Sequence, residues 1–113
     1  LNAVAAGDLD GMMRDYEEDA YLDWIGGPLD GRYRGQAQIK AVWQKFIAAN
    51  AGAPRPVKFS PLEAFTNAKG ATVHASAEYG GTTPVKVWHA LSYRDGALGT
   101  EIWQIAPAIK LAP

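Results

Sequence analysis

The chain has 113 residues, which is enough for one domain with its own core and too few for two. It is 48% hydrophobic, has a net charge of −1 and contains no cysteine, so disulfides, thiol catalysis and cysteine-based zinc sites are excluded. There is no basic run, the two histidines lack metal-ligand spacing, and no apolar run reaches the roughly 20 residues of a membrane-spanning helix. We therefore expect no nucleic acid, metal or membrane as a partner. The chain starts at Leu1 rather than Met, so a cytoplasmic and an exported location both stay open.

The N-terminal part of the chain predicts two helical segments. Residues 1–6 are apolar and are followed by Gly7, which is typical of the last turns of a helix whose beginning lies upstream. Asp8 is a suitable N-cap for a second helix over residues 9–18. That helix would carry an inward-facing stripe at helical spacing, made of Leu9, Met12, Met13 and Tyr16.

A short strand and a longer helix follow. Residues 20–25 predict a strand with Leu22 and Trp24 on one face and Asp23 on the other, and a loop rich in glycine comes next. Residues 36–50 predict a helix whose apolar stripe consists of Ile39, Val42, Trp43, Phe46 and Ile47.

The second half of the chain alternates with the period of β-strands. Pro61 indicates an edge position or a bulge in the first of them, and Asp95-Gly96 is a hairpin signal between the last two. The helices are segregated from the strands, which predicts one α+β domain over residues 1–113 with a curved sheet. The expected antiparallel strands cover residues 57–66, 71–79, 85–93 and 98–106.

The last hairpin carries the strongest candidate for chemistry. His89 shares a strand face with Val87, Leu91 and Tyr93, and Glu101 is expected close to it on the neighbouring strand. Burial lowers the pKa of a histidine and a nearby carboxylate raises it, so such a pair suits proton transfer near neutral pH. The alternatives are a core histidine bonded to the backbone or water, and a Glu101 that pairs with an arginine or points to solvent.

Three stretches of the sequence resemble the NTF2-like superfamily, the cone-shaped α+β fold of SnoaL-like polyketide cyclases, ketosteroid isomerases and scytalone dehydratases. They are Ala6-Gly-Asp-Leu-Asp-Gly, Tyr16-Glu-Glu-Asp-Ala-Tyr-Leu-Asp and Gly35-Gln-Ala-Gln-Ile-Lys-Ala-Val-Trp. The resemblance extends over nearly the whole chain and implies a cone of helices on a curved, mostly antiparallel sheet. The front of the first helix is missing from it.

The ketosteroid isomerase pattern is broken in this sequence. In the resemblance, Trp24 stands where ketosteroid isomerases have their catalytic aspartate base, and Asp23 lies one residue earlier. His89 stands where the family has a neutral aspartate, the second of its two oxyanion-binding groups. We therefore predict no steroid isomerisation. SnoaL-like cyclases are similar in another way, because they carry a histidine and an acid on the last strands, as His89 and Glu101 would be here.

The resemblance implies a pocket for a small hydrophobic molecule, with cofactor-free isomerisation, cyclisation or dehydration as the possible chemistry. His89, Glu101 and Asp23 are the expected catalytic residues, although Asp23 is equally suited to a surface position. The alternative function is a non-catalytic binding or dimerisation module. Trp88, on the opposite face to His89, suits a homodimer contact on the outer face of the sheet. Each predicted ligand-contacting ring could instead be core packing; the set is Tyr16, Trp24, Trp43, Phe46, Tyr93 and Trp103.

Overall fold

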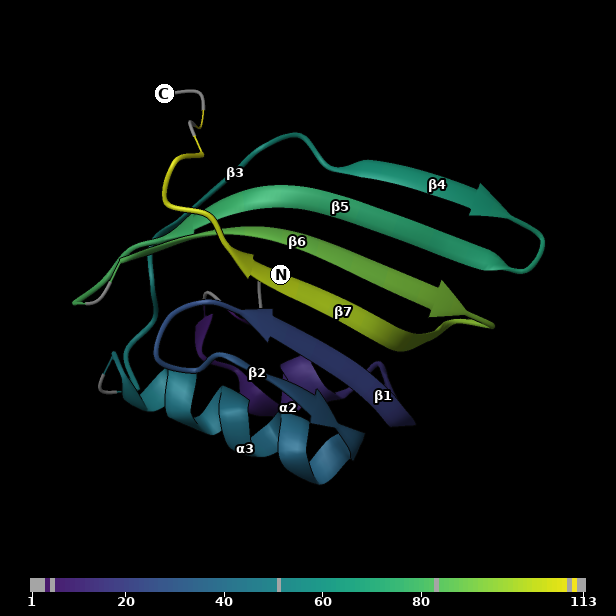
Figure 1. Ribbon diagram of the computed structural model, residues 1–113, viewed down its shortest axis with the longest axis horizontal. Helices are drawn as coiled ribbons and strands as arrows, with labels where there is room; N and C mark the ends of the chain where they lie inside the picture. Colours follow the sequence, from purple (N-terminus) through teal and green to yellow (C-terminus); the bar gives the residue numbers. More distant parts are fainter. Residues whose placement is uncertain (1–3, 5, 51, 83, 110, 112–113) are drawn as a thin grey trace.

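A computed structural model describes residues 4, 6–50, 52–82, 84–109 and 111 of the chain. The elements that can be bounded within these residues are one strongly curved seven-stranded sheet and two helices packed beneath one half of it (Figure 1). The strand order is β2-β1-β7-β6-β5-β3, and β4 pairs with the other end of β5. Strands β1 and β7 are parallel, and the remaining pairs are antiparallel. The elements are α2 (Leu9–Met13), β1 (Tyr16–Ile25), β2 (Gly31–Arg34), α3 (Gly35–Ala48), β3 (Val57–Phe59), β4 (Glu63–Asn67), β5 (Gly70–Tyr79), β6 (Val85–Arg94) and β7 (Ala97–Ile105).

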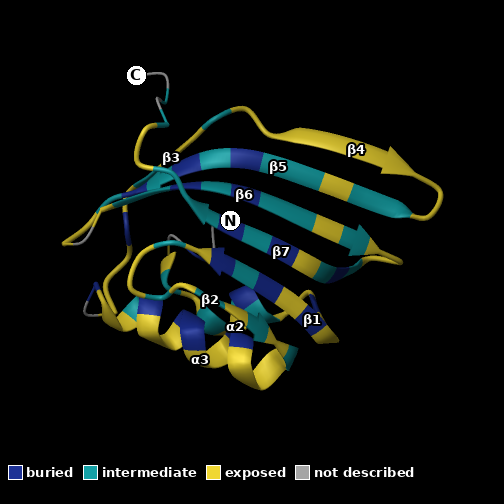
Figure 2. Ribbon diagram, viewed as in Figure 1, coloured by how far each residue is buried: buried dark blue, intermediate teal, exposed yellow. Residues whose placement is uncertain are grey.

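This architecture confirms the α+β cone, with helices on a curved, mostly antiparallel sheet. The helix α3 packs on β1 and β2 through the stripe that its sequence spacing predicts, because Ile39, Val42, Trp43 and Phe46 are all buried. Buried residues also alternate along β1 and along the C-terminal half of β5 (Figure 2). The β4–β5 hairpin extends past the helices, so its concave side is left open (Figure 1).

The start of β1 differs from the sequence-based prediction. Asp8 caps α2 through a hydrogen bond from the backbone N–H of Gly11, but the helix ends at Met13 and a strand starts at Tyr16. The prediction of a helix to residue 18 was therefore wrong. Tyr16 pairs with Leu98 of β7, and this tertiary pairing overrides the helical spacing of the apolar residues. Val4 and Ala6 are helical, whereas residues 1–3 and 5 of the first predicted helix lie outside the described residues.

Two further differences concern short strands. The segment over residues 31–34 forms β2, which pairs with β1 and was expected to be a loop. The segment over residues 57–66 is divided into β3 and β4, and Pro61 lies in the gap between them. Proline has no N–H to donate to a neighbouring strand, so the interruption at this position has a direct physical cause.

Aromatic rings fill the centre of the cone. Trp103 stacks on Trp24 at 4.9 Å between ring centroids and contacts Trp43 at the same distance. Tyr79 stacks on the other side of Trp103 at 5.3 Å, and Phe46 touches Trp24 at 5.6 Å. This cluster, called the aromatic cluster below, occupies the space between α3 and the sheet. Access to the interior is therefore limited to hollows at its margins.

Candidate functional site

Glu101 is the most deeply buried acid of the described chain, and a tyrosine holds it. Its side chain points inward from β7 and is only 3% exposed. The hydroxyl of Tyr16, at the start of β1, donates a hydrogen bond to Oε1 of Glu101 and accepts one from Nε1 of Trp43 at 3.0 Å. A chain of hydrogen bonds thus runs from α3 through β1 to the carboxyl group on β7, and the donor to that carboxyl group is a neutral phenol.

Burial controls how this group titrates. Loss of solvation disfavours the carboxylate and raises the pKa of Glu101 to about 7, although the hydrogen bond from Tyr16 opposes the shift. Burial and the neighbouring Glu101 together raise the pKa of Tyr16, so its hydroxyl stays neutral. A carboxyl group with a pKa near 7 can both release and accept a proton at neutral pH.

Glu101 borders a small cavity next to a larger apolar hollow. The small cavity has a volume of about 70 Å³, and its wall includes Glu101, Tyr16 and Trp43. The larger hollow, about 620 Å³, lies on the open concave side of β5 and β6 and has mainly apolar walls. Both volumes share Leu91 and Tyr93 in their walls. A molecule in the apolar hollow would therefore lie next to the cavity that contains the carboxyl group.

His89 lies on the same inner face as Glu101 but does not bond to it. It is fully buried opposite Trp103, whereas Glu101 lies opposite Leu91, one step along the strand pair. Nε2 of His89 is 3.2 Å from the hydroxyl of Tyr79, and Nδ1 has no partner in the described residues. Burial lowers the pKa of His89 to about 3, so the ring is neutral at physiological pH. The direct His–Glu contact expected from the sequence is absent in this geometry.

Asp23 lies away from both groups. It follows the buried Leu22 on β1 and points to the outer face of the sheet, where its Oδ2 is 3.2 Å from Nη2 of Arg32. The Arg32 side chain is 70% exposed, so this ion pair is a surface feature. Because the cavities near Glu101 lie on the inner face of the sheet, Asp23 cannot contact a molecule bound there. We therefore do not include Asp23 in the candidate site.

The six predicted ligand-contacting rings divide into three groups. Tyr16, Trp43 and Tyr93 border the small cavity beside Glu101. Trp24 and Phe46 border a different hollow, described below. Trp103 is fully buried within the aromatic cluster and borders none of these hollows.

Two hydrogen-bond partners of the candidate residues were not predicted from the sequence. Tyr16 was recognised as an inward-facing ring but not as the partner of Glu101, and Tyr79 was not singled out as a partner of His89. The alternation of β5 does place Tyr79 on the inner face, which was the available signal. The described residues contain no group of three or more histidine or acidic side chains placed to hold a metal ion. None of the helices in the described part of the chain has the length and hydropathy to cross a membrane.

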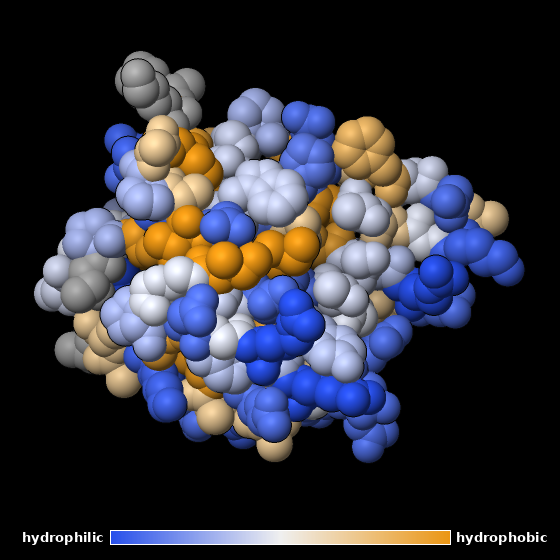
Figure 3. Space-filling view, viewed as in Figure 1, coloured by the Kyte–Doolittle hydropathy of each residue, from blue (hydrophilic) through white to orange (hydrophobic). Residues whose placement is uncertain are grey.

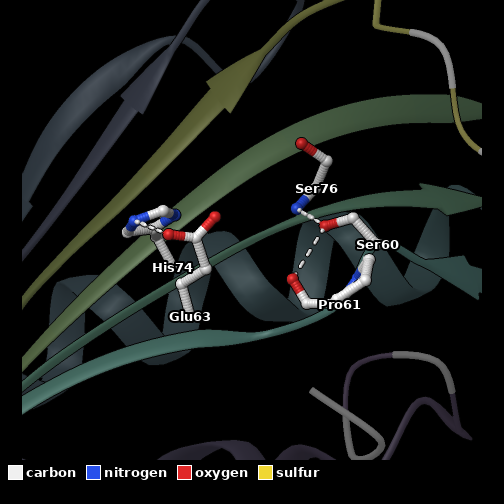
Figure 4. Close-up of polar contacts among 5 residues, drawn as sticks. All are labelled: Ser60, Pro61, Glu63, His74 and Ser76. Atoms are coloured by element: carbon white, nitrogen blue, oxygen red, sulfur yellow. Dashed lines mark hydrogen bonds and ion pairs between the residues drawn. The ribbon is translucent and has the colours of Figure 1, made fainter.

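The outer face of the sheet carries a second group of rings. His74 stacks on Phe65 at 5.8 Å and lies 5.8 Å from Trp88, and Phe65 is 61% exposed. Nε2 of His74 is 3.7 Å from Oε2 of Glu63 on the neighbouring strand, and Figure 4 shows the two side chains facing one another. The viewed surface in Figure 3 has a band of hydrophobic residues over its middle, with hydrophilic residues below it.

Comparisons with solved structures agree with this fold. An NTF2-like protein of unknown function from Pseudomonas putida is 17% identical, with a TM-score of 0.78, and the match covers 98% of this chain and 87% of that one. A ketosteroid isomerase-like protein from Parabacteroides distasonis is 11% identical over 96% of this chain and 83% of its own, with a TM-score of 0.71. A polyketide cyclase-like protein from Sinorhizobium meliloti is 20% identical over 90% and 86%, with a TM-score of 0.59.

At these identities the structural matches show the fold alone. Among curated proteins, none matches the sequence. The family described as the SnoaL-like domain matches residues 1–98, which is most of the chain. The protein therefore belongs to the SnoaL-like domain family, within the NTF2-like fold.

Proposed function

We propose that the protein is a cofactor-independent acid–base enzyme that shifts a proton within a small hydrophobic carbonyl compound. The observation that carries this proposal is the buried Glu101, whose pKa is about 7 and which borders a cavity next to an apolar hollow. Buried carboxyl groups with pKa values near the working pH are characteristic of proton-transfer sites. Isomerisation, cyclisation and dehydration all require such a transfer.

In this proposal the apolar hollow, Glu101 and Tyr16 have different roles. The substrate body occupies the apolar hollow, and its reacting end enters the small cavity. Glu101 as carboxylate removes a proton from carbon next to the carbonyl and returns it elsewhere on the same molecule, so the enzyme ends in its starting state. Tyr16 orients the carboxylate through Oε1, which leaves Oε2 for the substrate. His89 is neutral and borders neither of these hollows, so we assign it no step in the proton transfer.

A test that needs no knowledge of the natural substrate is elimination of 5-nitrobenzisoxazole. A general base removes the C–H proton at C3 of the isoxazole ring, the N–O bond breaks, and a coloured cyanophenolate forms. We expect a rate that rises with pH around pH 7 in the wild type, because the carboxylate form of Glu101 is the active one. Glu101→Gln should reduce the rate at least about 100-fold.

The matched control is Asp23→Asn, which also removes one carboxylate from the sheet but on its outer face. It should retain the wild-type rate and pH profile. Equal rates in wild type and Glu101→Gln would rule out Glu101 as the base. If the compound binds without turnover, the non-catalytic ligand-binding module becomes the better description of the protein.

We also propose a homodimer through the outer face of the sheet. The proposal is supported by the second group of rings, which consists of Phe65, His74 and Trp88, and by the hydrophobic band visible in Figure 3. Large rings exposed on a sheet face are stabilised by a partner surface. Sedimentation velocity should find a dimer, and Trp88→Glu should convert it to monomer. A wild-type chain that sediments as a monomer at 100 µM would refute the dimer.

A further inference from the structure

A separate hollow of about 360 Å³ lies at the other margin of the aromatic cluster. It is enclosed by the β1–β2 loop, the C-terminal end of α3, the first residues of β6 and the end of β7. It shares no wall residue with the two hollows near Glu101. We call it the Arg55 pocket. Its volume lies within the range of small-molecule sites.

The walls of the Arg55 pocket combine apolar surface with positive charge. Trp24, Leu29, Phe46 and Ile105 contribute apolar wall, and Lys45 and Arg55 contribute two cations. None of the described wall residues is an aspartate or a glutamate. The electrostatic potential of the pocket therefore favours an anion over a cation.

Arg55 is held rigidly in this wall. It is only 5% exposed, its Nη1 donates a hydrogen bond to the carbonyl oxygen of Gly80 at 3.0 Å, and its guanidinium lies 4.4 Å from the centre of the Phe46 ring. Lys45, in the last turn of α3, is exposed. One cation is thus fixed in the apolar wall, and the second lies at the solvent side.

The rim of the pocket is also fixed in advance. Oδ1 of Asn50, just after α3, accepts hydrogen bonds from the backbone N–H and the hydroxyl of Thr82 at 2.8 and 3.0 Å. These bonds tie the turn before β6 to the end of α3, on either side of the hollow. A pocket whose walls are already ordered loses little conformational entropy when a ligand enters it.

We propose that the Arg55 pocket binds a small amphiphile with an apolar body and one anionic head group, in the class of medium-chain carboxylates. The body lies against Trp24, Phe46 and Ile105, and the head group lies toward Arg55 and Lys45. This site is additional to the proposed proton-transfer site and does not depend on it.

The test uses decanoate as the probe, below its micelle concentration, with protein labelled with 5-fluorotryptophan. The chain has four tryptophans, and only Trp24 borders the Arg55 pocket. Fluorine NMR should show a saturable shift of the Trp24 signal, while the Trp88 signal on the outer face stays unchanged. Decyltrimethylammonium, with the same chain and the opposite charge, should bind more weakly than decanoate.

Two variants and a matched control test the site itself. Lys45→Gln should weaken decanoate binding roughly threefold, the size expected for an exposed charge pair, whereas Lys40→Gln, on the same helix but outside the pocket, should leave it unchanged. Ala49→Phe, which fills the pocket from an exposed wall position, should abolish the Trp24 shift. The proposal is overturned if decanoate leaves Trp24 unshifted, if it binds no better than the cationic analogue, or if Ala49→Phe binds it normally.

Discussion

At the scale of single residues, Glu101 is a buried acid whose hydrogen-bond partner among the described residues is neutral. Glu101 receives its hydrogen bond from the phenol of Tyr16, and that phenol is in turn held by the indole N–H of Trp43. A cation would stabilise the carboxylate and lower its pKa, whereas a neutral donor offsets only part of the cost of burial. The group consequently titrates near neutrality instead of near its ordinary value of 4.5.

The contribution of Tyr16 can be measured by removing its hydroxyl. In Tyr16→Phe the carboxylate loses a hydrogen bond that favours its charged form, so we expect the pKa of Glu101 to rise above about 7. Carbon-detected NMR titration of the side-chain carboxyl measures this directly. Tyr93→Phe is the control, because Tyr93 borders the same cavity but has no hydrogen bond to Glu101. A Glu101 pKa that is unchanged in Tyr16→Phe would contradict the assignment.

The sequence predicts the faces of these residues better than their partners. Alternation along the strands correctly predicts that His89 and Glu101 both point inward, because side-chain direction is a local property of a strand. It does not predict that Tyr16 would hydrogen-bond to Glu101 or that Tyr79 would contact His89. Those bonds depend on the relative position of strands far apart in the chain, since Tyr16 and Glu101 are separated by 85 residues.

At the scale of elements, the segment just after α3 makes a close contact with the β5–β6 turn. Asn50 is 5% exposed and bonds both to Thr82 and to the carbonyl oxygen of Ala53. Gly81 passes directly over it with φ +108, and a Cβ atom there would lie 2.4 Å from Oδ1 of Asn50. Glycine is required here both for its backbone conformation and for its lack of a side chain.

Gly81→Ala should therefore destabilise the fold more than alanine at another positive-φ glycine. Gly52→Ala is the matched control, because Gly52 has φ +75 but nothing within 4 Å of the added Cβ. We expect a loss of about 1 kcal/mol for Gly52→Ala from the backbone alone and a further loss of about 1–3 kcal/mol for Gly81→Ala. Urea unfolding measures both values. Equal losses would show that the turn moves aside at no cost.

Element boundaries were harder to predict than element types. The helix α3 and the strands β5, β6 and β7 occur close to where periodicity predicts them. The strand β1 begins earlier because its first residue pairs with β7 across an irregularity between Tyr16 and Tyr21. Strict alternation would turn Glu18 inward between Tyr16 and Ala20, whereas the irregularity leaves all three acidic residues of this stretch exposed. Local alternation cannot reveal it.

At the scale of the whole molecule, two buried groups make opposite contributions to the pH dependence of stability. The pKa of Glu101 is raised on folding, so the folded state holds its proton more strongly, and this contribution to stability is lost as pH rises from about 4.5 to about 7. The pKa of His89 is lowered on folding to about 3. Its contribution is present above pH 6.5 and is lost as pH falls toward 3.

The two effects nearly cancel between pH 5 and 6.5, and single variants should reveal each of them. We expect the unfolding free energy of Glu101→Gln to rise with pH, relative to wild type, by about 1 kcal/mol per pH unit in this range. The unfolding free energy of His89→Gln, relative to wild type, should fall by a similar amount per pH unit. Urea titrations at pH 5, 5.5, 6 and 6.5 measure both slopes, and the other carboxylates cancel in the comparison. Parallel pH profiles for the three proteins would contradict both assigned shifts.

The parallel pairing of β1 with β7 also has a consequence for the order in which the chain folds. The hairpins from β4 to β7 join residues close in sequence, whereas β1 must wait for the last strand, because its partners begin at Leu98. Contacts between distant residues form late, since a long loop must close before they are made. During synthesis on the ribosome, Tyr16 emerges long before Glu101 exists. The bond between them therefore forms only in a chain that has been synthesised through β7 and has closed its sheet.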